Sequence, residues 1–418
     1  GTDNIWLFFP LVFCENRNIE TLKTIFEKEF NPPEKEPLQE LLSQLVNGEL
    51  VKENSASKAS KKSNDYDNIK VRFLTHQGGC GGTRQDAQSL ARLLAGYVNN
   101  PNVAGATVLS LGCQNLEIDI FKEALSNLQS GKEKPVLIYD QQTEGTVDAF
   151  LSKIIKNSFE EIKKANEIKR SPAPLSKLTI GLECGGSDGF SGITSNPTLG
   201  QVSDILSDLG GKSILGEFPE LTGVEQELVN RCTSEPLAIK FLNLMQQYEL
   251  AAASVGSGFD MNPSPGNIKD GLITDAMKSA GAAKKAGNAP ISNVLDYTEY
   301  ATIPGVSLLC TPGNDVESTT ALAGSGANII LFTTGLGTPT GNPITPVIKV
   351  SSNSILTKKM SDIIDFDCGT IITERQSLEE VGDALLEYII KVASGEEIPK
   401  AVQLKQIDFI PWKRGVSL

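Results

Sequence analysis

Histidine, long apolar runs and basic residues are all scarce in this sequence. Its 418 residues include one histidine, His76, so a zinc site built from several histidines of this chain is excluded. The longest apolar runs, such as 5–12 with Pro10 inside it, are shorter than the roughly 20 residues that a membrane-spanning helix needs. Lysine and arginine number 38 against 51 aspartates and glutamates, and the formal charge of -13 argues against nucleic acid or a membrane surface as a partner.

The cysteines do not suggest a disulfide framework. There are seven of them, an odd number, and they are spread along the whole chain. This usage favours a reducing, cytoplasmic setting. The composition, with 39% apolar and 21% charged residues, is that of a globular protein, and the length predicts two or three domains.

Strands and helices alternate along the first part of the chain. An apolar run over 6–13 predicts a buried strand, and helical spacing of apolar residues follows over 21–30. Three further strands are predicted over 69–75, 106–111 and 135–139, with helical patterns between them. This alternation predicts a mainly parallel sheet covered by helices.

A domain boundary is predicted beside two prolines. A helix over 147–169 ends before Pro172 and Pro174, which cannot continue it. The predicted domains are therefore 1–172 and 173–418.

The second domain repeats the pattern of the first. Predicted strands over 178–182, 306–309 and 329–332 each run into a loop rich in glycine, proline or asparagine. Open α/β sheets bind ligands at such strand ends. We therefore predict an α/β protein of two alternating strand–helix domains with mainly parallel sheets, and a site in the glycine-rich loops between them.

Four residues with metal-binding chemistry follow predicted strands. His76 and Cys80 share one glycine-rich loop, while Cys113 and Cys184 each lie beside a glycine. Three thiolates and an imidazole would suit a borderline metal such as iron. The alternatives are a hydrogen-bonded loop histidine and cysteines buried as small apolar side chains. The cysteines that we assign to the buried class are Cys14, Cys232, Cys310 and Cys368.

Polar loops in the second domain offer groups that could hold a small polar ligand. The segment 262–267 is followed by Lys269 and Asp270, and Asn314 precedes Asp315. Their amides and charges suit hydroxyls and a carboxylate. Turn-stabilising hydrogen bonds from the asparagines are the alternative explanation.

Several of these loops together resemble the altronate/galactarate dehydratase family. The resemblance runs in order from Trp6 to Trp412. The segments that carry it are HQGGCGGTRQD (76–86), LSLGC (109–113), CGGSDGFSGITSNP (184–197), TPGND (311–315) and TTGLGTP (333–339).

The resemblance implies a lyase that removes water from a sugar acid and yields a 2-keto-3-deoxy acid in an iron-dependent reaction. Members usually carry an N-terminal antifreeze-like domain, which is missing from this sequence and could be supplied in cis or in trans, as in the related sulfolactate sulfo-lyase. Galactarate-type members typically have arginine where this chain has Leu336. Because a guanidinium is a bidentate partner for a carboxylate, its loss favours altronate, with one carboxylate, over galactarate, with two.

The expected reaction needs a base for the C2 proton and help for the departing C3 hydroxide. The metal would be Fe²⁺, bound by His76 with cysteines or Asp188, or an iron–sulfur cluster held by Cys80, Cys113 and Cys184. With a cluster, His76 is free to act as base or acid. The predicted catalytic residues are His76, Asp188 and Lys349. The predicted substrate-binding residues are Arg84, Ser187, Asn196, Asn267, Lys269, Asn314 and Thr334.

Other functions stay open at this point. A galactarate dehydratase or the large subunit of a sulfolactate sulfo-lyase would belong to the same family. A non-catalytic sugar-acid-binding subunit would belong to a different class. The partner expected in every case is a small sugar acid, with a homo-oligomer as the default assembly and no nucleic acid or membrane.

Overall fold

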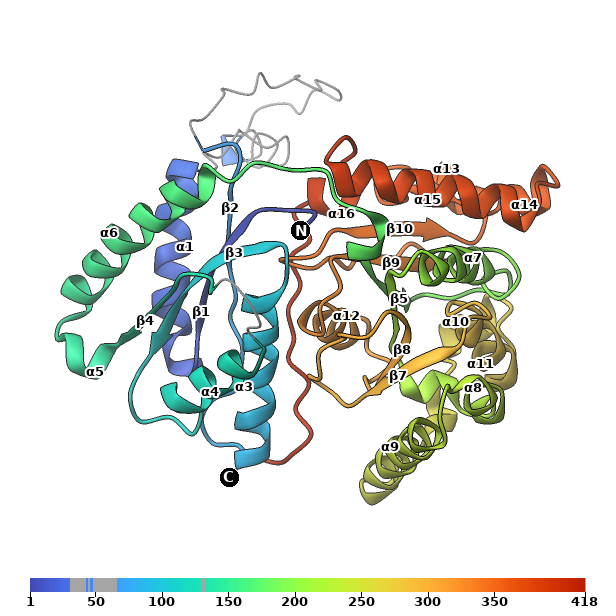
Figure 1. The fold of residues 1–418 in the computed structure, drawn as a ribbon, viewed down its shortest axis with the longest axis horizontal. Coiled ribbons are helices and arrows are strands. Elements are labelled where there is room, and N and C mark those ends of the chain that lie inside the picture. The colour runs from blue at the N-terminus through green and yellow to red at the C-terminus, as the bar shows by residue number, and fades with distance from the viewer. Residues whose placement is uncertain (31–42, 44–45, 48–65, 129–132, 418) are drawn as a thin grey trace.

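The computed structural model describes residues 1–30, 43, 46–47, 66–128 and 133–417. Within these ranges the chain forms two sheets, and every strand pairing in them is parallel (Figure 1). The predicted α/β class with parallel sheets is confirmed. Among the described helices, none has the length and apolarity that crossing a bilayer would require.

The first sheet has four strands in the order β2-β1-β3-β4. Trp6 and Phe8 of β1 pack against the helices of one face, and Leu7 and Phe9 pack against those of the other. Because successive side chains of a strand point to opposite faces, a strand covered on both sides is apolar throughout. The elements are β1 (Ile5–Pro10), α1 (Asn16–Phe30), β2 (Lys70–Phe73), α3 (Arg84–Asn99), β3 (Val103–Ser110), α4 (Ile118–Leu128), β4 (Val136–Asp140), α5 (Gln141–Glu144) and α6 (Val147–Asn166).

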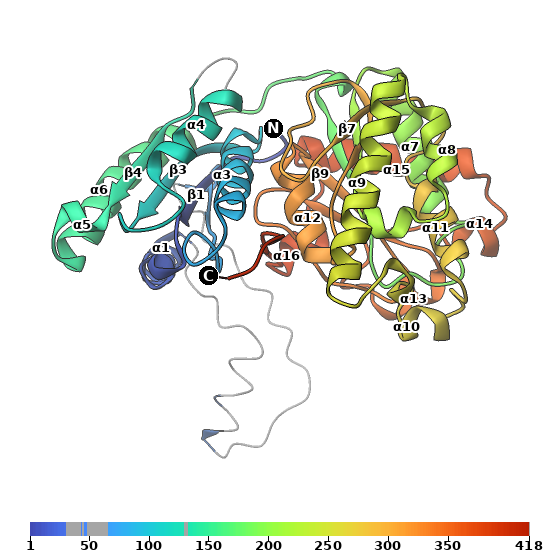
Figure 2. The same ribbon diagram turned by 90° about the horizontal axis from the view of Figure 1, so that it is seen from below.

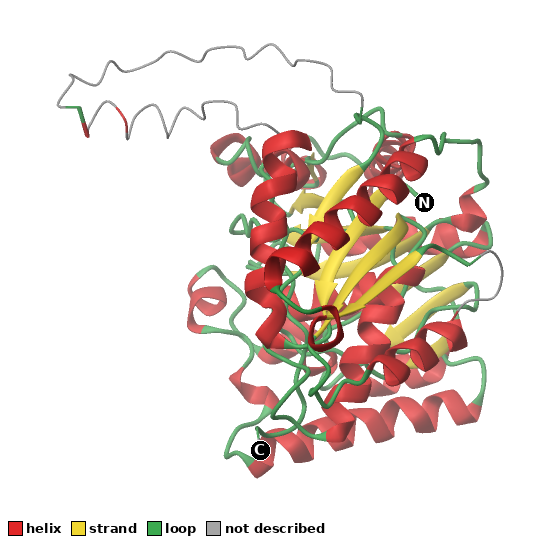
Figure 3. Cartoon of the chain, turned by 90° about the vertical axis from the view of Figure 1, so that its left-hand side faces the viewer, coloured by secondary structure: helices red, strands yellow, loops and turns green. Residues whose placement is uncertain are grey.

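The second sheet has seven strands in the order β11-β10-β9-β5-β6-β8-β7. Figure 3, seen from the side of the first sheet, shows strands lying between helices. The strands are β5 (Thr179–Cys184), β6 (Lys212–Leu215), β7 (Ile291–Leu295), β8 (Gly305–Leu309), β9 (Ile329–Thr334), β10 (Val347–Ser351) and β11 (Phe366–Asp367). The helices are α7 (Ser195–Asp208), α8 (Glu225–Arg231), α9 (Glu235–Ser254), α10 (Pro265–Lys269), α11 (Asp275–Lys284), α12 (Asp315–Gly324), α13 (Ser354–Lys359), α14 (Thr370–Thr373), α15 (Leu378–Ser394) and α16 (Lys400–Gln403).

The observed elements differ from the predicted ones mainly at their ends. The first strand stops at Pro10 rather than continuing to residue 13, because proline has no N–H to extend the ladder. The long helix ends at Asn166. Strands β6, β7 and β10 had no counterpart in the sequence patterns, since they are short and carry polar residues such as Lys212 and Lys349.

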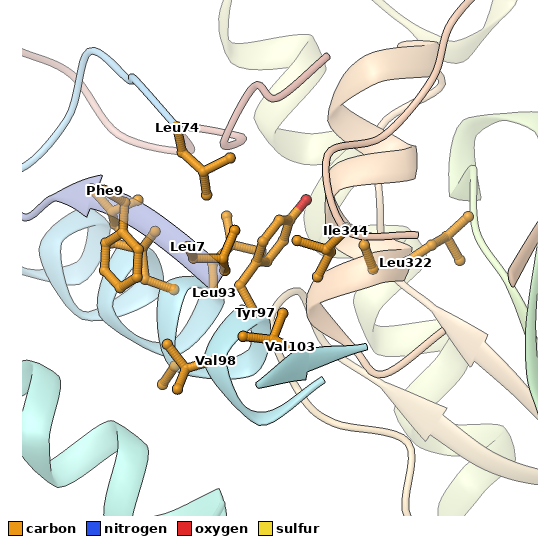
Figure 4. Packing of buried hydrophobic residues seen from close by; sticks show 14 of the residues in the cluster. Leu7, Phe9, Leu74, Leu93, Tyr97, Val98, Val103, Leu322 and Ile344 are labelled. Carbon is orange, nitrogen blue, oxygen red and sulfur yellow. The ribbon is translucent and has the colours of Figure 1, made fainter. Parts of the chain in front are cut away.

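The two sheets are joined through the helix pair α3 and α12 (Figure 4). Leu93 and Tyr97 of α3 share one apolar cluster with Leu322 of α12 and with Ile344. The backbones approach so closely that a Cβ on Gly96 would lie 2.0 Å from the carbonyl oxygen of Gly324. The predicted division at residue 172 falls between the two sheets, although their cores are continuous at this contact.

The C-terminal segment returns from the second half to the first (Figure 2). The Trp412 N–H donates to the Tyr297 hydroxyl over 2.7 Å. The Arg414 N–H donates to Asp86 in the first turn of α3 over 3.1 Å. The segment therefore links both halves at the end where α3 begins.

Candidate active site

The strand order of the second sheet reverses between β5 and β9. From β5 the chain passes to β6 on one side, and it later returns to β9 on the other side. At such a switch point the loops that leave the carboxyl ends diverge, and open α/β sheets bind their ligands there. The loops that begin at Cys184 and after Thr334 are two of those that the sequence analysis selected.

Asp188 holds two of these loops together. Its carboxylate accepts hydrogen bonds from the Ser191 hydroxyl in its own loop and from the Ser352 hydroxyl after β10, each over 2.8 Å. The Asn353 amide donates to its other oxygen over 2.9 Å. Asp188 was predicted to be catalytic, and these contacts place it at the switch point as a fixed acceptor.

The predicted substrate-binding residues divide into two groups. Arg84 and Lys269 are exposed at helix ends, in the two halves of the chain. The others take part in hydrogen bonds that shape the loops. These are Ser187, whose carbonyl accepts from Asn267; Asn196, which accepts from Thr333; Asn314, which caps α12; and Thr334, which accepts from three loop N–H groups.

Lys349 is the third residue predicted to be catalytic, and it is fully buried in β10. Its Nζ lies 3.3 Å from the centre of the Phe332 ring and has no hydrogen-bond partner among the described residues. Burial lowers the pKa of Lys349 to about 7. Asp315 stands at the start of α12, where its carboxylate would be 2.2 Å from a Cβ on Gly185. Burial and the charge of Glu220 raise the pKa of Asp315 to about 6.

A buried ionic cluster lies beside these groups, at the carboxyl end of β5. The Lys285 ammonium donates to the Cys184 sulfur over 2.9 Å and to Glu217 over 2.5 Å. The Lys278 ammonium pairs with Glu220 at 2.8 Å, and the Cys184 thiol donates to the same carboxylate over 3.1 Å. Each carboxylate is therefore matched by an ammonium group.

The electrostatics of this cluster follow from its burial. Burial and the neighbouring Glu220 raise the pKa of Glu217 to about 7, against the pull of Lys285. Burial opposes ionisation of Glu220 as well, but Lys278 and Lys285 outweigh it and lower the pKa of that carboxyl. Burial and the nearby carboxylates raise the pKa of Cys184 well above its usual value, so its sulfur is held as a thiol.

The same cluster includes a group of donors that could bind a metal. Within the described ranges, Cys184, Glu217 and Glu220 are the one set of three such side chains whose ligand atoms all lie within 4.8 Å of one another. A sulfur and two carboxylates suit Fe²⁺, and the Oε1 atom of Glu217 has no hydrogen-bond partner in the described structure. Lys285 and Lys278 already neutralise these donors, however, so a metal would have to displace the Lys285 contact and deprotonate the thiol.

His76, Cys80 and Cys113 lie at the carboxyl edge of the first sheet. The buried His76 ring bonds to the Pro10 carbonyl through Nε2 at 2.8 Å, and its Nδ1 accepts the Gly78 N–H at 3.1 Å. Burial lowers the pKa of His76 to about 4, so the ring is neutral and both nitrogens are engaged. The structure thus separates Cys184, on the second sheet, from the two other cysteines of the predicted metal set.

A cavity of about 520 Å³ lies between the two halves. His76 and Cys80 line it from the first half, and Glu317 of α12 lines it from the second. Trp412 and Lys413 of the C-terminal segment close one side. From the second half its lining comes from Tyr297, Glu317 and the C-terminal segment, and not from the glycine-rich loops of that half in which the sequence predicted the site.

One cysteine was assigned to the wrong class. Cys14 was expected to be a buried small side chain, but it is exposed, in a 3-10 turn (Phe13–Glu15) directly after the first strand. It directly follows the strand predicted over 6–13, which in fact ends at Pro10. Cys232 is half-buried, and Cys310 and Cys368 are buried as predicted.

Four residues of the buried cluster were not among the predicted site residues: Glu217, Glu220, Lys278 and Lys285. Glu217 has one available signal, because it follows Gly216 at the end of a strand. Its φ of 64° is in the left-handed region, which a residue with a side chain rarely adopts and which often marks a functional site. The two lysines lie in a helical segment and give no signal of their own in the sequence.

Comparison with known proteins assigns these loops to a family. Residues 175–417 match the model of the D-galactarate/altronate dehydratase C-terminal region, and residues 1–166 match the model of the second domain of D-galactarate dehydratase/altronate hydrolase. The chain belongs to the D-galactarate/altronate dehydratase family. The predicted resemblance is confirmed.

Individual members of this dehydratase family match most of the chain. An altronate dehydratase of Bacillus subtilis is 38% identical over 79% of this chain and 65% of its own length. The altronate dehydratase of Escherichia coli is 36% identical over 78% of this chain and 66% of its own length. The (2R)-sulfolactate sulfo-lyase subunit beta of Chromohalobacter salexigens is 31% identical over 73% of this chain and 77% of its own length. The chain therefore spans about two thirds of the altronate dehydratases that it matches.

Proposed function

We propose that this chain carries the active site of a sugar-acid dehydratase that acts in the cytoplasm on altronate. Family membership supports the dehydratase chemistry. The observation that carries the proposal is the electrostatic interaction of Lys349 with Asp315 near the switch point, where the pKa values of the two groups are about 7 and about 6. The product would be a 2-keto-3-deoxy acid.

The reaction needs one group that accepts a proton and one that supplies it. Neutral Lys349 takes the C2 proton, the electron pair of that C–H bond forms a C2–C3 double bond, and the C3–O bond breaks. Asp315 gives its proton to the departing hydroxide, which leaves as water, and the remaining enol tautomerises to the 2-keto acid. An iron ion or cluster, when bound, would supply a Lewis acid for the leaving hydroxyl.

The loops around Lys349 and Asp315 would bind the substrate. Asp188 fixes the loops after β5 and β10, and Ser187 and Thr334 of the neighbouring loops are the candidates for binding the sugar hydroxyls. The cations Arg84 and Lys269 remain candidates for the carboxylate, and neutral His76 for a second proton transfer. Leu336 is exposed in the loop after β9, where an arginine would add a partner for a second carboxylate.

The first test is turnover. The full chain, prepared anaerobically with Fe²⁺, is expected to form 2-keto-3-deoxy acid from altronate at least tenfold faster than from galactarate, as measured by mass spectrometry of the product. Leu336→Arg is the matched specificity variant and should lower the ratio of the rate on altronate to the rate on galactarate. Faster turnover of galactarate by the unchanged chain would overturn the substrate assignment.

Because the chain matches only part of the length of the altronate dehydratases, a second experiment is needed. The part of the Bacillus subtilis relative outside the match is added as a separate polypeptide. If turnover needs that addition, the chain is one component of a divided enzyme. If altronate binds in calorimetry and is never converted in either arm, the chain is a binding subunit and the dehydratase proposal is wrong.

A sulfo-lyase is the second candidate. It is favoured by one observation, that the chain matches 77% of the sulfolactate sulfo-lyase beta subunit, a larger share than for the altronate dehydratases. The same preparation is incubated with sulfolactate, and sulfite is measured. Sulfite release without conversion of altronate would decide for this candidate.

A further inference from the structure

We propose that Cys14, Cys80 and Cys113 together hold an iron–sulfur cluster at the carboxyl edge of the first sheet. The inference deepens the proposed function, since it gives the dehydratase its iron site, but it stands on the arrangement of these three side chains. It replaces Cys184 of the predicted set with Cys14.

Strand order brings the three cysteines to one edge. The first sheet begins β2-β1-β3, so these strands are neighbours and parallel. Cys14 lies in the turn after β1, Cys80 in the loop after β2, and Cys113 in the loop after β3. Because parallel strands have their carboxyl ends at the same edge, all three cysteines emerge there.

Hydrogen bonds tie the three segments to one another. The Phe13 N–H donates to the Gly78 carbonyl over 3.0 Å, and the Leu116 N–H donates to the Gly79 carbonyl over 3.1 Å. Gly79 sits so tightly against the segment after β1 that a Cβ on it would lie 2.0 Å from the Leu11 carbonyl oxygen. The middle loop, which carries Cys80, is thus fixed to the segments that carry the other two cysteines.

These three cysteines differ from the other four in their exposure to solvent. Cys14, Cys80 and Cys113 are exposed, whereas the other four cysteines are buried or half-buried. An unmodified cysteine is usually buried, because its side chain is apolar. Three exposed cysteines at one edge of a sheet are what binding of a common iron–sulfur cluster requires. Gly79, Gly81 and Gly112 have φ of 93°, 67° and 104°, so the loops turn here without side chains that would fill the space.

The spacing of the sulfurs argues against a single metal ion bound by all three cysteines. A tetrahedral site with metal–sulfur bonds of roughly 2.3 Å holds its sulfurs about 4 Å apart. Within the described ranges, these three cysteines form no set with all sulfurs inside 4.8 Å of one another. A multi-iron cluster binds each thiolate at a different iron, so its ligands stand farther apart.

The surroundings fit a reactive cluster. Three thiolates leave one iron of a four-iron cluster without a protein ligand. Cys184 is not available as a fourth, because it ends β5 of the second sheet, where its sulfur lies 2.9 Å from the Lys285 ammonium. Cys80 also lines the cavity of about 520 Å³ between the two halves, so a small acid in that cavity would lie beside the cluster.

The test measures iron and acid-labile sulfide in the full chain after anaerobic reconstitution with Fe²⁺ and sulfide, together with the electron paramagnetic resonance of the reduced protein. The variants are Cys14→Ser, Cys80→Ser and Cys113→Ser, with Cys232→Ser and Cys184→Ser as matched controls. Circular dichroism checks that each variant folds. We expect each of the first three to lose at least tenfold in sulfide per chain, and both controls to keep it.

Two results would overturn the inference. One is a Cys14→Ser protein that keeps the full cluster while Cys184→Ser loses it, which would restore the set predicted from the sequence. The other is iron uptake by the unchanged chain without acid-labile sulfide. Because these readouts do not depend on turnover, a cluster in a chain that fails to dehydrate any sugar acid would refute the proposed function and leave this site standing.

Discussion

Individual side chains decide the chemistry of this site through burial. Lys349 is fully buried beside Phe332, and its ammonium has no hydrogen-bond partner in the described structure. Such a costly buried group makes Lys349 a candidate for the proposed proton transfer. Its type and position in the sequence made it a candidate, but only burial explains why its pKa falls to about 7.

We expect Lys349→Met to make the protein more stable and less active. Methionine fills a similar volume without a charge, so the free energy of unfolding at pH 7 should rise by about 1–4 kcal/mol, as when buried charges are replaced by apolar groups. The value of kcat should fall by roughly 10²–10⁴-fold, the usual contribution of a general base. Urea unfolding and steady-state kinetics on altronate measure the two effects, and unchanged kcat would remove Lys349 from the mechanism.

The pH dependence gives an independent check on the same residue. Folding lowers the pKa of Lys349 from 10.5 to about 7, so between these values the unfolded chain holds a proton that the folded chain has released. Below about pH 7 the folded chain carries the full cost of burying the charged ammonium. Between about pH 7 and 10.5 that cost disappears, so this residue makes the free energy of unfolding rise with pH over this range. Lys349→Met should lose that rise. In the unchanged enzyme, kcat should increase with pH up to about 7.

At the scale of elements, the turn after β6 organises the buried cluster. Glu217 occupies the left-handed region at φ 64°, and its N–H donates to the Thr311 hydroxyl over 2.6 Å. The strained backbone turns its carboxylate toward Lys285 and the Cys184 N–H. A short turn thereby connects β5, β6 and the end of α11.

Glu217→Ala should destabilise the fold by about 3–5 kcal/mol, because it leaves the buried Lys285 ammonium without its carboxylate. Adding Lys285→Met should recover much of that loss, so the two changes will be strongly non-additive in a double-mutant cycle measured by urea unfolding. Glu249→Ala, at an exposed position of α9, is the control and should stay within about 0.5 kcal/mol. Additive effects at Glu217 and Lys285 would mean that the pair is not coupled.

The sequence predicted most of the strands, but not all of them. Long apolar runs such as β1, β3 and β9 are visible because both faces of these strands are covered. Strands β6 and β10 are short and include Lys212 and Lys349, so they follow no local pattern. Their place in the sheet depends on partners that are distant in sequence.

At the scale of the whole molecule, the contact between α3 and α12 sets the distance between the two sheets. Asn100 at the end of α3 donates to the carbonyls of Ala323 and Ala327 over 2.9 and 2.8 Å. Gly96 and Gly324 allow the helix backbones to touch. This contact fixes the cavity that loops of both halves line.

Gly96→Ala tests that contact. A methyl group there would lie 2.0 Å from a backbone oxygen, so we expect a loss of about 1–3 kcal/mol in the free energy of unfolding, although alanine ordinarily stabilises a helix by up to about 1 kcal/mol. Gly266→Ala in α10 is the matched control, since the nearest atom to its Cβ would be 3.7 Å away. Equal stability of the two variants in urea unfolding would show that the helices can separate freely.

The sequence by itself determined the fold class, the parallel alternation of strands and helices, and the family, because these depend on local periodicity and on continuous motifs. The tertiary structure decided which loops meet. It placed Cys184 with Glu217, Glu220 and Lys285 at the carboxyl end of β5, and Cys14, Cys80 and Cys113 at the carboxyl edge of the first sheet. Strand order in a sheet is set by packing between distant segments, and no local pattern in the chain encodes it.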